Sequence, residues 1–382
     1  MKLALVRQKY TPFGGAERFV ERALGALAAQ GTEVTLLCRE WSGGGAGAFP
    51  IDICDPAYAK IMGRKGRDAS FAHAVQAIIA QHRFDLVQSH ERIPGCHVFR
   101  AGDGVHATWL ELRGRAQNAA QRFATRIHPW HRYVLDAEAA MFRHPDLRAV
   151  ICNSRMVRDD IRQRFGVAED RLHLIHNGVD AEHFHPGLCE EHRAELRAQW
   201  HIPATAPLLL FVGSGFERKG VATLLDALAV MGRRDVHLLV VGKDKRQPVF
   251  ARQAARLGLA HRVHFAGPQP DVRPFYGAAD LFCLPTLYDP FPNAALEALA
   301  CGLPVVTTTT CGAAELIEPG VNGGLCEALD VSALAQQLAA LVEPTVEQRA
   351  AARASVKMLT PENAAERLLG LYSSLLSRRP PL

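Results

Sequence analysis

Apolar segments of three to five residues alternate with longer helical patterns along almost all of this 382-residue chain. In the first half, the predicted buried strands cover residues 3–6, 34–38, 86–88, 97–101 and 149–152. In the second half, they cover residues 208–212, 237–241, 263–266, 281–284 and 304–307. A parallel sheet with helices on both faces buries its strands completely, which produces continuous apolar runs of this kind. The sequence therefore predicts an α/β protein with two doubly wound, Rossmann-like domains.

Helical patterns separate these strands, and turn residues indicate where one domain ends. The predicted helices cover residues 16–30, 68–82, 109–126, 154–165, 220–231, 250–257, 294–300 and 331–341. A turn cluster at 176–180, followed by Pro186, predicts a first domain of residues 1–182 and a second of residues 183–360. The last helix, 361–376, has Pro361 at its first position. Its apolar face needs a partner, so we expect the segment 361–382 to return to the first domain.

Composition indicates a globular protein of ordinary polarity. The chain is 48% hydrophobic and 22% charged, and no apolar run approaches the roughly 18–20 residues that span a bilayer. Its first residues become charged too soon for a signal peptide. The nine cysteines are scattered without a Cys-x-x-Cys pair, which predicts reduced, mostly buried thiols in a cytoplasmic protein. A net charge of +5 without a zinc-finger or RNP-like motif does not indicate a nucleic-acid partner.

Positive charge is concentrated between residues 100 and 164. The arginines that lie near one another there are Arg113, Arg115, Arg122, Arg126 and Arg132. The same stretch contains large apolar side chains, namely Trp109, Leu112, Phe123 and Trp130. The pattern predicts an amphipathic surface for anionic lipid or a phosphorylated acceptor. A partly buried helix between domains explains it equally well.

The stretch from Asp289 to Pro304 predicts a sugar-nucleotide site. Asp289 lies in a loop and Glu297 lies a turn or two into the following helix, eight positions later. The first carboxylate can hold sugar hydroxyls and the second can hold a ribose. Between them, the amides that start the helix, near Asn293 and Ala294, can meet a diphosphate, because a helix N-terminus attracts anions. The aromatic Phe291 and small residues complete the segment.

A glycine-containing loop follows the first strand of each domain. Residues 213–220 lack the glycine that a dinucleotide fingerprint requires, and Arg218 and Lys219 stand there instead. Two cations at the carboxyl edge of a sheet can take the charge that develops on a departing diphosphate, whereas a solvated cationic pair is the alternative. In the first domain, Gly14 and Gly15 allow backbone amides to approach a ligand, unless they form an ordinary strand–helix turn.

Three further positions are candidates at strand ends. Asp103 follows a strand of the first domain and could orient or deprotonate an acceptor hydroxyl, or simply cap its loop. The nearby His106 and His90 are better explained as surface or packing residues. In the second domain, Gly267 ends a strand whose loop could clasp a base, and the turn at 312–315 allows another close approach.

Taken together, these motifs resemble the retaining glycosyltransferases of the two-Rossmann-domain (GT-B) class called family 4. The resemblance covers nearly the whole chain and depends on Gly14 and Gly15, the segment 177–180, Arg218 with Lys219, and the acids at 289 and 297. It implies a UDP-sugar donor, a cleft between the domains and retention of the anomeric configuration by a front-face mechanism. It also implies that no metal or other cofactor is needed, which agrees with the lack of an Asp-x-Asp pair.

The resemblance assigns roles to individual residues. Glu297 would bind the donor ribose, Asp289 would hold hydroxyls of the transferred sugar, and Arg218 and Lys219 would hold the diphosphate with the amides near 293 and 294. This chain departs from the family pattern at three places. Asp289 replaces the usual glutamate, prolines 290 and 292 replace glycines and remove amide donors, and Asp103 stands where many members have a histidine.

Within the family, the segment 10–15 and the basic stretch after Asp103 most resemble the lipopolysaccharide core glucosyltransferases. This similarity implies transfer of glucose from a UDP-sugar to an inner-core heptose by a protein peripheral to the cytoplasmic face of the bacterial inner membrane. The alternatives are a transferase of the same fold with an exopolysaccharide or small-metabolite acceptor, and a non-catalytic sugar-nucleotide-binding protein.

Overall fold

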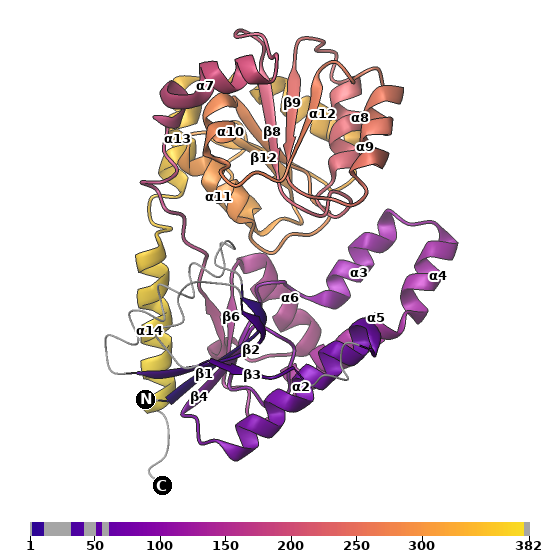
Figure 1. The fold of residues 1–382 in the computed structure, drawn as a ribbon. Helices are drawn as coiled ribbons and strands as arrows, with labels where there is room; N and C mark the ends of the chain where they lie inside the picture. The colour runs from indigo at the N-terminus through magenta and orange to yellow at the C-terminus, as the bar shows by residue number, and fades with distance from the viewer. Residues whose placement is uncertain (1, 11–31, 42–50, 56–60, 378–382) are drawn as a thin grey trace. The chain divides into compact units, whose positions relative to one another are not determined.

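The computed structural model describes residues 2–10, 32–41, 51–55 and 61–377, and the chain divides into two compact units (Figure 1). The first unit is Met1–Asn177 together with Pro361–Leu382, and the second is Gly178–Thr360. The boundary in the structure therefore lies five residues before the expected one at 182, within the turn cluster that the sequence indicated.

The described residues of the first unit form a parallel sheet of seven strands in the order β3-β2-β1-β4-β5-β6-β7. These strands are β1 (Lys2–Tyr10), β2 (Glu33–Trp41), β3 (Ile51–Ile53), β4 (Leu86–Ser89), β5 (Val98–Arg100), β6 (Ala149–Cys152) and β7 (Leu172–Leu174). Alternate side chains of β1 enter different cores: Leu3 and Leu5 pack on one face, and Ala4 and Val6 pack on the other. Burial on both faces explains the continuous apolar runs.

The helices of the first unit include a long excursion between β5 and β6. Among the described residues before the C-terminal helix, they are α2 (Gly63–Gln81), α3 (His106–Arg115), α4 (Ala119–Ile127), α5 (Pro129–Phe142) and α6 (Arg155–Phe165), with a 3₁₀ turn η2 (Glu169–Arg171) before β7. The single helix predicted for residues 109–126 is wrong, because α3 ends at Arg115 and a second helix starts after Asn118. The side chain of Asn118 accepts from the backbone of Gln121, whose side chain accepts in return, so this capping box starts a new helix.

The C-terminal helix α14 (Pro361–Ser377) packs against the first unit, as predicted. Its buried side chains, Leu368, Leu371 and Tyr372 among them, share a core with β1, β2 and β4–β6. In addition, the hydroxyl of Tyr372 donates to Oε1 of Gln88 at 2.7 Å, and both residues are buried. The helix therefore completes one face of a sheet whose strands come from the other end of the sequence.

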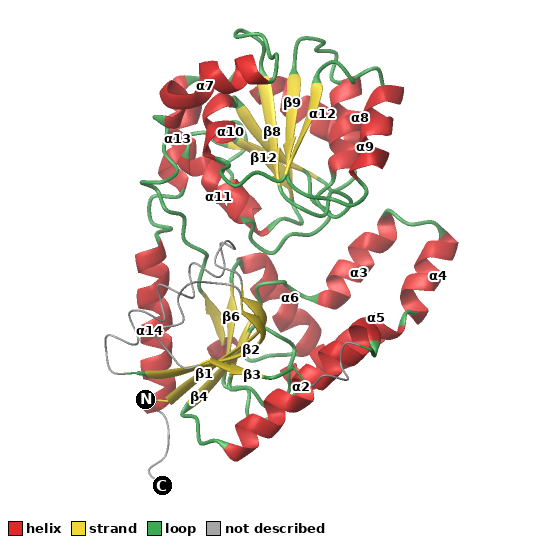
Figure 2. Cartoon of the chain, viewed as in Figure 1, coloured by secondary structure: helices red, strands yellow, loops and turns green. Residues whose placement is uncertain are grey.

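The second unit contains a parallel sheet of six strands in the order β10-β9-β8-β11-β12-β13. They are β8 (Leu208–Val212), β9 (His237–Val241), β10 (Val263–Gly267), β11 (Leu281–Leu284), β12 (Val305–Thr308) and β13 (Gly323–Cys326). Its helices are α7 (Leu188–Gln199), α8 (Val221–Val230), α9 (Gln247–Arg256), α10 (Arg273–Ala278), α11 (Asn293–Ala300), α12 (Val331–Leu341) and α13 (Val346–Ser355), with a 3₁₀ turn η3 (Gly312–Leu316). Helices flank the strands in both units, as Figure 2 shows.

All nine cysteines lie in the described residues as free thiols, and eight of them are buried. Their prediction as small buried hydrophobes is therefore confirmed for eight positions. In the described part of the chain, the helices are too short or too polar for any of them to cross a bilayer.

Candidate functional site

Strand order locates the site in the second unit. β8 is the first strand of this sheet, and the chain adds β9 and β10 on one side of it and β11 to β13 on the other. The loops that leave β8 and β11 therefore diverge at their carboxyl ends, which is where open α/β sheets bind ligands. Arg218 and Lys219 follow β8, and Asp289 follows β11. The predicted residues thus lie at the topological switch point.

Glycines let the loop after β8 approach its neighbours closely. A Cβ atom at Gly242, after β9, would lie 2.0 Å from the carbonyl oxygen of Gly213. A Cβ atom at Gly213 would lie 2.6 Å from Cδ of Lys219. The Lys219 side chain is therefore laid against the backbone of Gly213, and a larger residue at either glycine would displace this loop.

Asp289 forms an ion pair with both predicted cations. Its Oδ2 atom lies 3.1 Å from Nζ of Lys219 and 3.3 Å from Nη1 of Arg218. The side chains of Asp289 and Lys219 are only 10% and 12% exposed, whereas that of Arg218 is 36% exposed. Nη1 of Arg218 also donates to the carbonyl of Tyr288 at 2.9 Å. One carboxylate and two cations leave one excess positive charge in a sheltered position, which suits a bound diphosphate.

Backbone bonds fix the segment that carries Asp289. Its amide donates to the carbonyl of Thr310 at 3.3 Å, and its carbonyl accepts from the amide of Gly312 at 2.8 Å. The carbonyl of Arg218 accepts from the amide of Leu287 and from the hydroxyl of Thr286. Hydrogen bonds therefore connect the loops after β8, β11 and β12 to one another. The turn at 312–315 lies at this same edge of the sheet, as the sequence predicted.

Glu297, the second predicted acid, is positioned by a tyrosine. It lies on α11, and its Oε2 atom accepts from the hydroxyl of Tyr276 at 2.9 Å. The same hydroxyl also lies 3.1 Å from the carbonyl oxygen of Ala294. Burial raises the pKa of Tyr276 well above its ordinary value, so this phenol stays protonated and can act as a donor. Glu297 is half-buried, which leaves part of the carboxylate for a ligand.

The other donor-site candidates surround these acids. Asn293 and Ala294 form the first turn of α11, where no acidic side chain offsets the partial positive charge of the helix N-terminus. The ring of Phe291 packs in the core of the second unit and is 3% exposed. The ring therefore supports the loop, and only the main-chain groups of this residue can contact a ligand. Gly267 ends β10 with a φ of +68°, and its carbonyl accepts from the amide of Gly242.

Among the described residues, the candidates His90 and Asp103 of the first unit follow the carboxyl ends of β4 and β5. Gly14 and Gly15 fall outside the described residues. Asp103 is exposed in the turn after β5. Burial raises the pKa of Glu91, and Asp103 adds to this rise. Burial lowers the pKa of Arg92, but the carboxylates of Glu138 and Asp103 outweigh burial and raise it. His90 is buried, and its Nε2 lies 3.2 Å from Nε2 of Gln88. Asp103 and the donor residues belong to different units, so its proposed role as a base stays a prediction.

His106 belongs to a buried network that orders the start of α3. Its amide donates to Oε1 of Glu138 at 2.9 Å, and its Nε2 lies 3.0 Å from Nδ1 of His131. Arg92 donates to the same Oε1 atom of Glu138 at 2.8 Å. Burial, helped by Arg92, lowers the pKa of His106 to about 3, so this imidazole is neutral. The expected packing role of His106 therefore fits its surroundings.

The basic stretch divides into packed and exposed parts. Trp130 is held in place, because its Nε1 donates to Asp68 at 2.7 Å and Arg64 lies 3.4 Å from its ring centroid. On α4, by contrast, no residue is buried, and Phe123 and Ile127 are 64% and 54% exposed. These two residues are four positions apart and share one face of the helix. Of the apolar residues predicted for this surface, Phe123 is exposed, whereas Leu112 is buried and Trp130 is held in place. Ile127, which the sequence did not single out, is exposed beside Phe123.

Sequence reasoning did not find Tyr276, Gly242 or the pair of Arg92 and Glu138. Gly242 follows a predicted strand and could have been found by asking where backbones must approach. Tyr276 lies on the short helix α10, which has no recognisable period in the sequence. Nothing in the sequence pairs Arg92 with Glu138, 46 residues later.

Comparison with known proteins assigns the family. The family described as Glycosyl transferases group 1 matches residues 206–344, and Glycosyltransferase Family 4 matches residues 13–183. The chain is 30% identical over 322 residues to the lipopolysaccharide glucosyltransferase WaaG of Escherichia coli strain K12, with 83% of each chain covered. It belongs to the family 4 glycosyltransferases. This glycosyltransferase also matches the crystal structure of WaaG with a TM-score of 0.79 at 28% identity, over 96% of this chain and all of that one.

Two other similar proteins have been described. HepE of Anabaena, solved with UDP and glucose, matches with a TM-score of 0.70 at 21% identity, over 98% of this chain and 100% of that one, and this likeness shows the fold alone. A D-inositol 3-phosphate glycosyltransferase of Xylanimonas cellulosilytica is 31% identical over 243 residues, which cover 61% of this chain and 58% of that protein. The predicted family, the GT-B-like fold and the hexosyltransferase class are confirmed.

Proposed function

We propose that this glycosyltransferase moves a glucosyl unit from UDP-glucose to the heptose of a lipopolysaccharide inner-core precursor, with retention of anomeric configuration and without a metal ion. The observation that carries the proposal is the sheltered cluster of Lys219, Arg218 and Asp289 at the switch point of the second unit. Its excess positive charge suits the leaving diphosphate, and its carboxylate suits the hydroxyls of a sugar.

Each group has a part in the proposed reaction. The bond between the sugar C1 and the diphosphate oxygen breaks, and its electron pair goes to the diphosphate. Lys219, Arg218 and the first amides of α11 stabilise that charge. The acceptor oxygen bonds to C1 from the same face, and its proton passes to the leaving diphosphate oxygen or to Asp103. Glu297, oriented by Tyr276, holds the ribose of the donor.

The donor and acceptor are supported by relatives and by surface chemistry. WaaG is described as a lipopolysaccharide glucosyltransferase, and HepE has been solved with UDP and glucose. A lipopolysaccharide precursor is a lipid held at a membrane. The arginines of the stretch 113–132, beside the exposed Phe123 and Ile127, suit an anionic leaflet, where each Arg contributes about 1 kcal/mol of attraction. Peripheral contact at the inner face of the inner membrane is part of this proposal.

The decisive experiment is a transfer assay with a panel of nucleotide sugars. The purified enzyme is incubated with each donor and with a heptose-containing core acceptor, in EDTA and in manganese, and the product anomer is assigned by NMR. We expect turnover with UDP-glucose in both media and a product of unchanged configuration. Turnover that requires manganese, or an inverted product, would contradict the mechanism. Binding of UDP without hydrolysis or transfer of any donor would favour a non-catalytic protein.

A soluble acceptor is the main competing proposal, because one relative is a D-inositol 3-phosphate glycosyltransferase. Vesicle sedimentation separates the two possibilities. We expect binding to vesicles that contain anionic lipid, and we expect the double variant Phe123→Ser/Ile127→Ser to bind less while it retains UDP affinity. The double variant Ala119→Ser/Ala120→Ser on the same exposed helix is the matched control. If the wild-type protein does not bind the vesicles and glucosylates inositol phosphate, the soluble acceptor is favoured.

A further inference from the structure

The second unit contains a cavity of about 590 Å³ that is separate from the residues assigned to the donor. Its lining includes Asp280, which directly precedes β11, and Leu303, which lies two residues before β12. The cavity therefore lies toward the amino-terminal ends of these strands, whereas Arg218 and Asp289 follow carboxyl ends. Its volume falls in the range of small-molecule sites, about 300–1,000 Å³.

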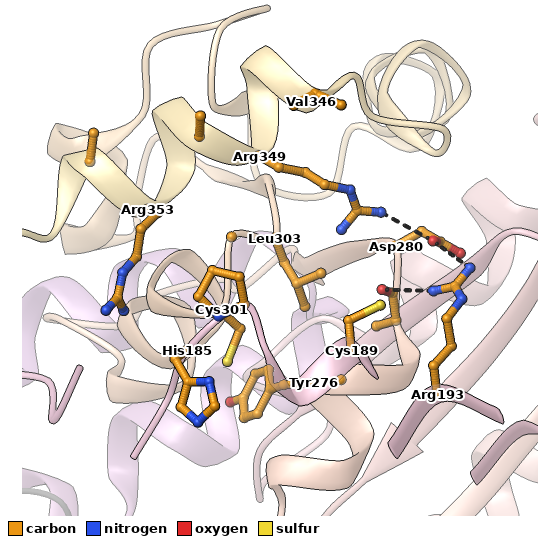
Figure 3. Close-up of a pocket in the computed structure, with 16 residues that line it drawn as sticks. His185, Cys189, Arg193, Tyr276, Asp280, Cys301, Leu303, Val346, Arg349 and Arg353 are labelled. Atoms are coloured by element: carbon orange, nitrogen blue, oxygen red, sulfur yellow. Dashed lines mark hydrogen bonds and ion pairs between the residues drawn. The ribbon is translucent and has the colours of Figure 1, made fainter. Parts of the chain in front are cut away.

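Positive charge exceeds negative charge in this cavity. Asp280 forms ion pairs with Arg193 at 2.9 Å and with Arg349 at 3.2 Å, and Figure 3 shows both guanidinium groups directed at it. Arg197, behind the lining, pairs with the same carboxylate at 2.8 Å. Arg353 also lines the cavity and donates to three backbone carbonyls. Three lining arginines against one carboxylate leave two excess positive charges.

Arg349 has unused hydrogen-bonding capacity. Among the described residues, its side chain makes one polar contact, from Nη2 to Asp280, and it is 33% exposed. A guanidinium has five N–H donors in a planar fork that matches phosphate oxygens. Apolar groups of Pro186, Leu303 and Val346 complete the lining. The charge and the lining together suit a phosphate monoester that carries an apolar group.

Tyr276 connects this cavity to the donor site. The residue lines the cavity, and its hydroxyl donates to Oε2 of Glu297 and lies 3.1 Å from the carbonyl oxygen of Ala294. The ring is almost fully buried and borders the cavity, so a ligand that fills the cavity packs against the ring and restrains it further. A first ligand that restrains a group used by a second ligand favours binding of the second.

We propose that the cavity binds an apolar phosphate monoester, and that its occupancy strengthens donor binding by holding Tyr276 on Glu297. The second half of this statement rests on the proposed function, because it takes Glu297 as the ribose ligand. The first half does not, and it is tested without any nucleotide.

Calorimetry with hexyl phosphate tests the site itself. We expect saturable binding of hexyl phosphate. Inorganic phosphate lacks the apolar chain and 1-hexanol lacks the phosphate, so each should bind with an affinity lower by about tenfold or more. Arg349→Gln should weaken binding about tenfold, and Ala350→Trp, at an exposed lining position of α13, should block it. Arg256→Gln, an exposed arginine on α9, is the matched control and should bind like wild type. No saturable binding, or binding unaffected by both cavity variants, would overturn the site.

A second titration tests the coupling. Saturating hexyl phosphate should lower the Kd for UDP at least threefold in the wild type and leave it unchanged in Tyr276→Phe, which keeps the ring but not the hydroxyl. An equal effect in both proteins, or no effect in the wild type, would overturn the link through Tyr276. If UDP fails to bind at all, the proposed function fails while the hexyl phosphate result stands. Ala350→Trp also shows whether the natural ligand is a lipid or a soluble molecule. If the variant binds phosphatidic acid vesicles less than wild type does, the ligand is a lipid. If the variant differs from wild type only in its binding of hexyl phosphate, the ligand is soluble.

Discussion

Lys219→Met isolates the charge on which the proposed chemistry depends. Methionine keeps the apolar stem that lies against Gly213 and removes only the ammonium group. In the native protein this ammonium lies 3.1 Å from Oδ2 of Asp289 and is mostly shielded from water. The substitution leaves Asp289 with Arg218, which is more exposed and 3.3 Å away. Two effects follow, one on catalysis and one on stability.

The effect on catalysis is the larger. A unit charge about 5 Å from the leaving oxygen contributes about 3 kcal/mol at an effective dielectric constant of about 20, so its loss lowers kcat by a factor of about 10²–10³. The effect on stability is smaller because Arg218 remains. Partial loss of partners by a buried carboxylate costs about 1–2 kcal/mol, which lowers the Tm of a unit of this size by about 2–8 °C.

Single-turnover transfer and thermal unfolding measure the two effects on one preparation. Lys357→Met removes an exposed lysine outside the cluster and should leave both the rate and the Tm unchanged. A Lys219→Met enzyme whose kcat is within threefold of wild type would refute the assignment of the leaving-group charge. If the variant regains the wild-type rate when the assay temperature is well below its unfolding transition, the lysine acts only on stability.

Three further predictions address other contacts. Glu297→Gln should raise the KM for UDP-glucose about tenfold with a smaller change in kcat, since a ribose contact is made equally in the ground and transition states; a pure kcat effect would contradict this role. Tyr372→Phe should lower the free energy of unfolding by about 1–3 kcal/mol, because the buried Oε1 of Gln88 loses its donor; denaturant titration measures this, and an unchanged midpoint would argue against the contact. Burial, reinforced by His128, lowers the pKa of His131 from 6.5 to about 4, so the unfolded chain binds more protons between these values and stability falls as pH falls across them; His131→Asn should flatten this part of the stability profile, and an unchanged slope would contradict it.

The fold was largely predictable because parallel strands buried on both faces have a strong signature. All ten predicted strands exist, and four of them, including residues 208–212 and 237–241, have the predicted bounds. β3, β7 and β13 were missed, since they are three or four residues long and β13 begins with two glycines. The helices α5, α7, α10 and α13 were missed as well. α10 is only six residues long, whereas α5 is rich in apolar residues and begins directly after the separately capped α4.

Side-chain partners were much less predictable than elements. The sequence pairs Arg218 and Lys219 with a diphosphate, but it does not show that both cations already hold Asp289. That contact joins residues about 70 positions apart, and only the strand order brings them together. Tyr276 is a similar case: its ring belongs to the core and its hydroxyl to the site, and a local pattern can indicate only the first.

The ion pairs of Asp289 also explain how a site with this charge can remain folded without a ligand. Two sheltered cations at one position repel each other and lose hydration, and both costs fall when a carboxylate lies between them. A bound diphosphate would supply further negative charge, so Lys219 could share its three donors between Asp289 and a phosphate oxygen. Asp289 would then be released in part toward the sugar hydroxyls. In this arrangement one acid serves the empty enzyme as a counterion and the occupied enzyme as a sugar ligand. Asp289→Asn should therefore strengthen binding of UDP, which has no sugar for residue 289 to hold, and weaken transfer from UDP-glucose. Calorimetry and the transfer assay on the same variant test both halves, and weaker UDP binding would contradict the counterion role.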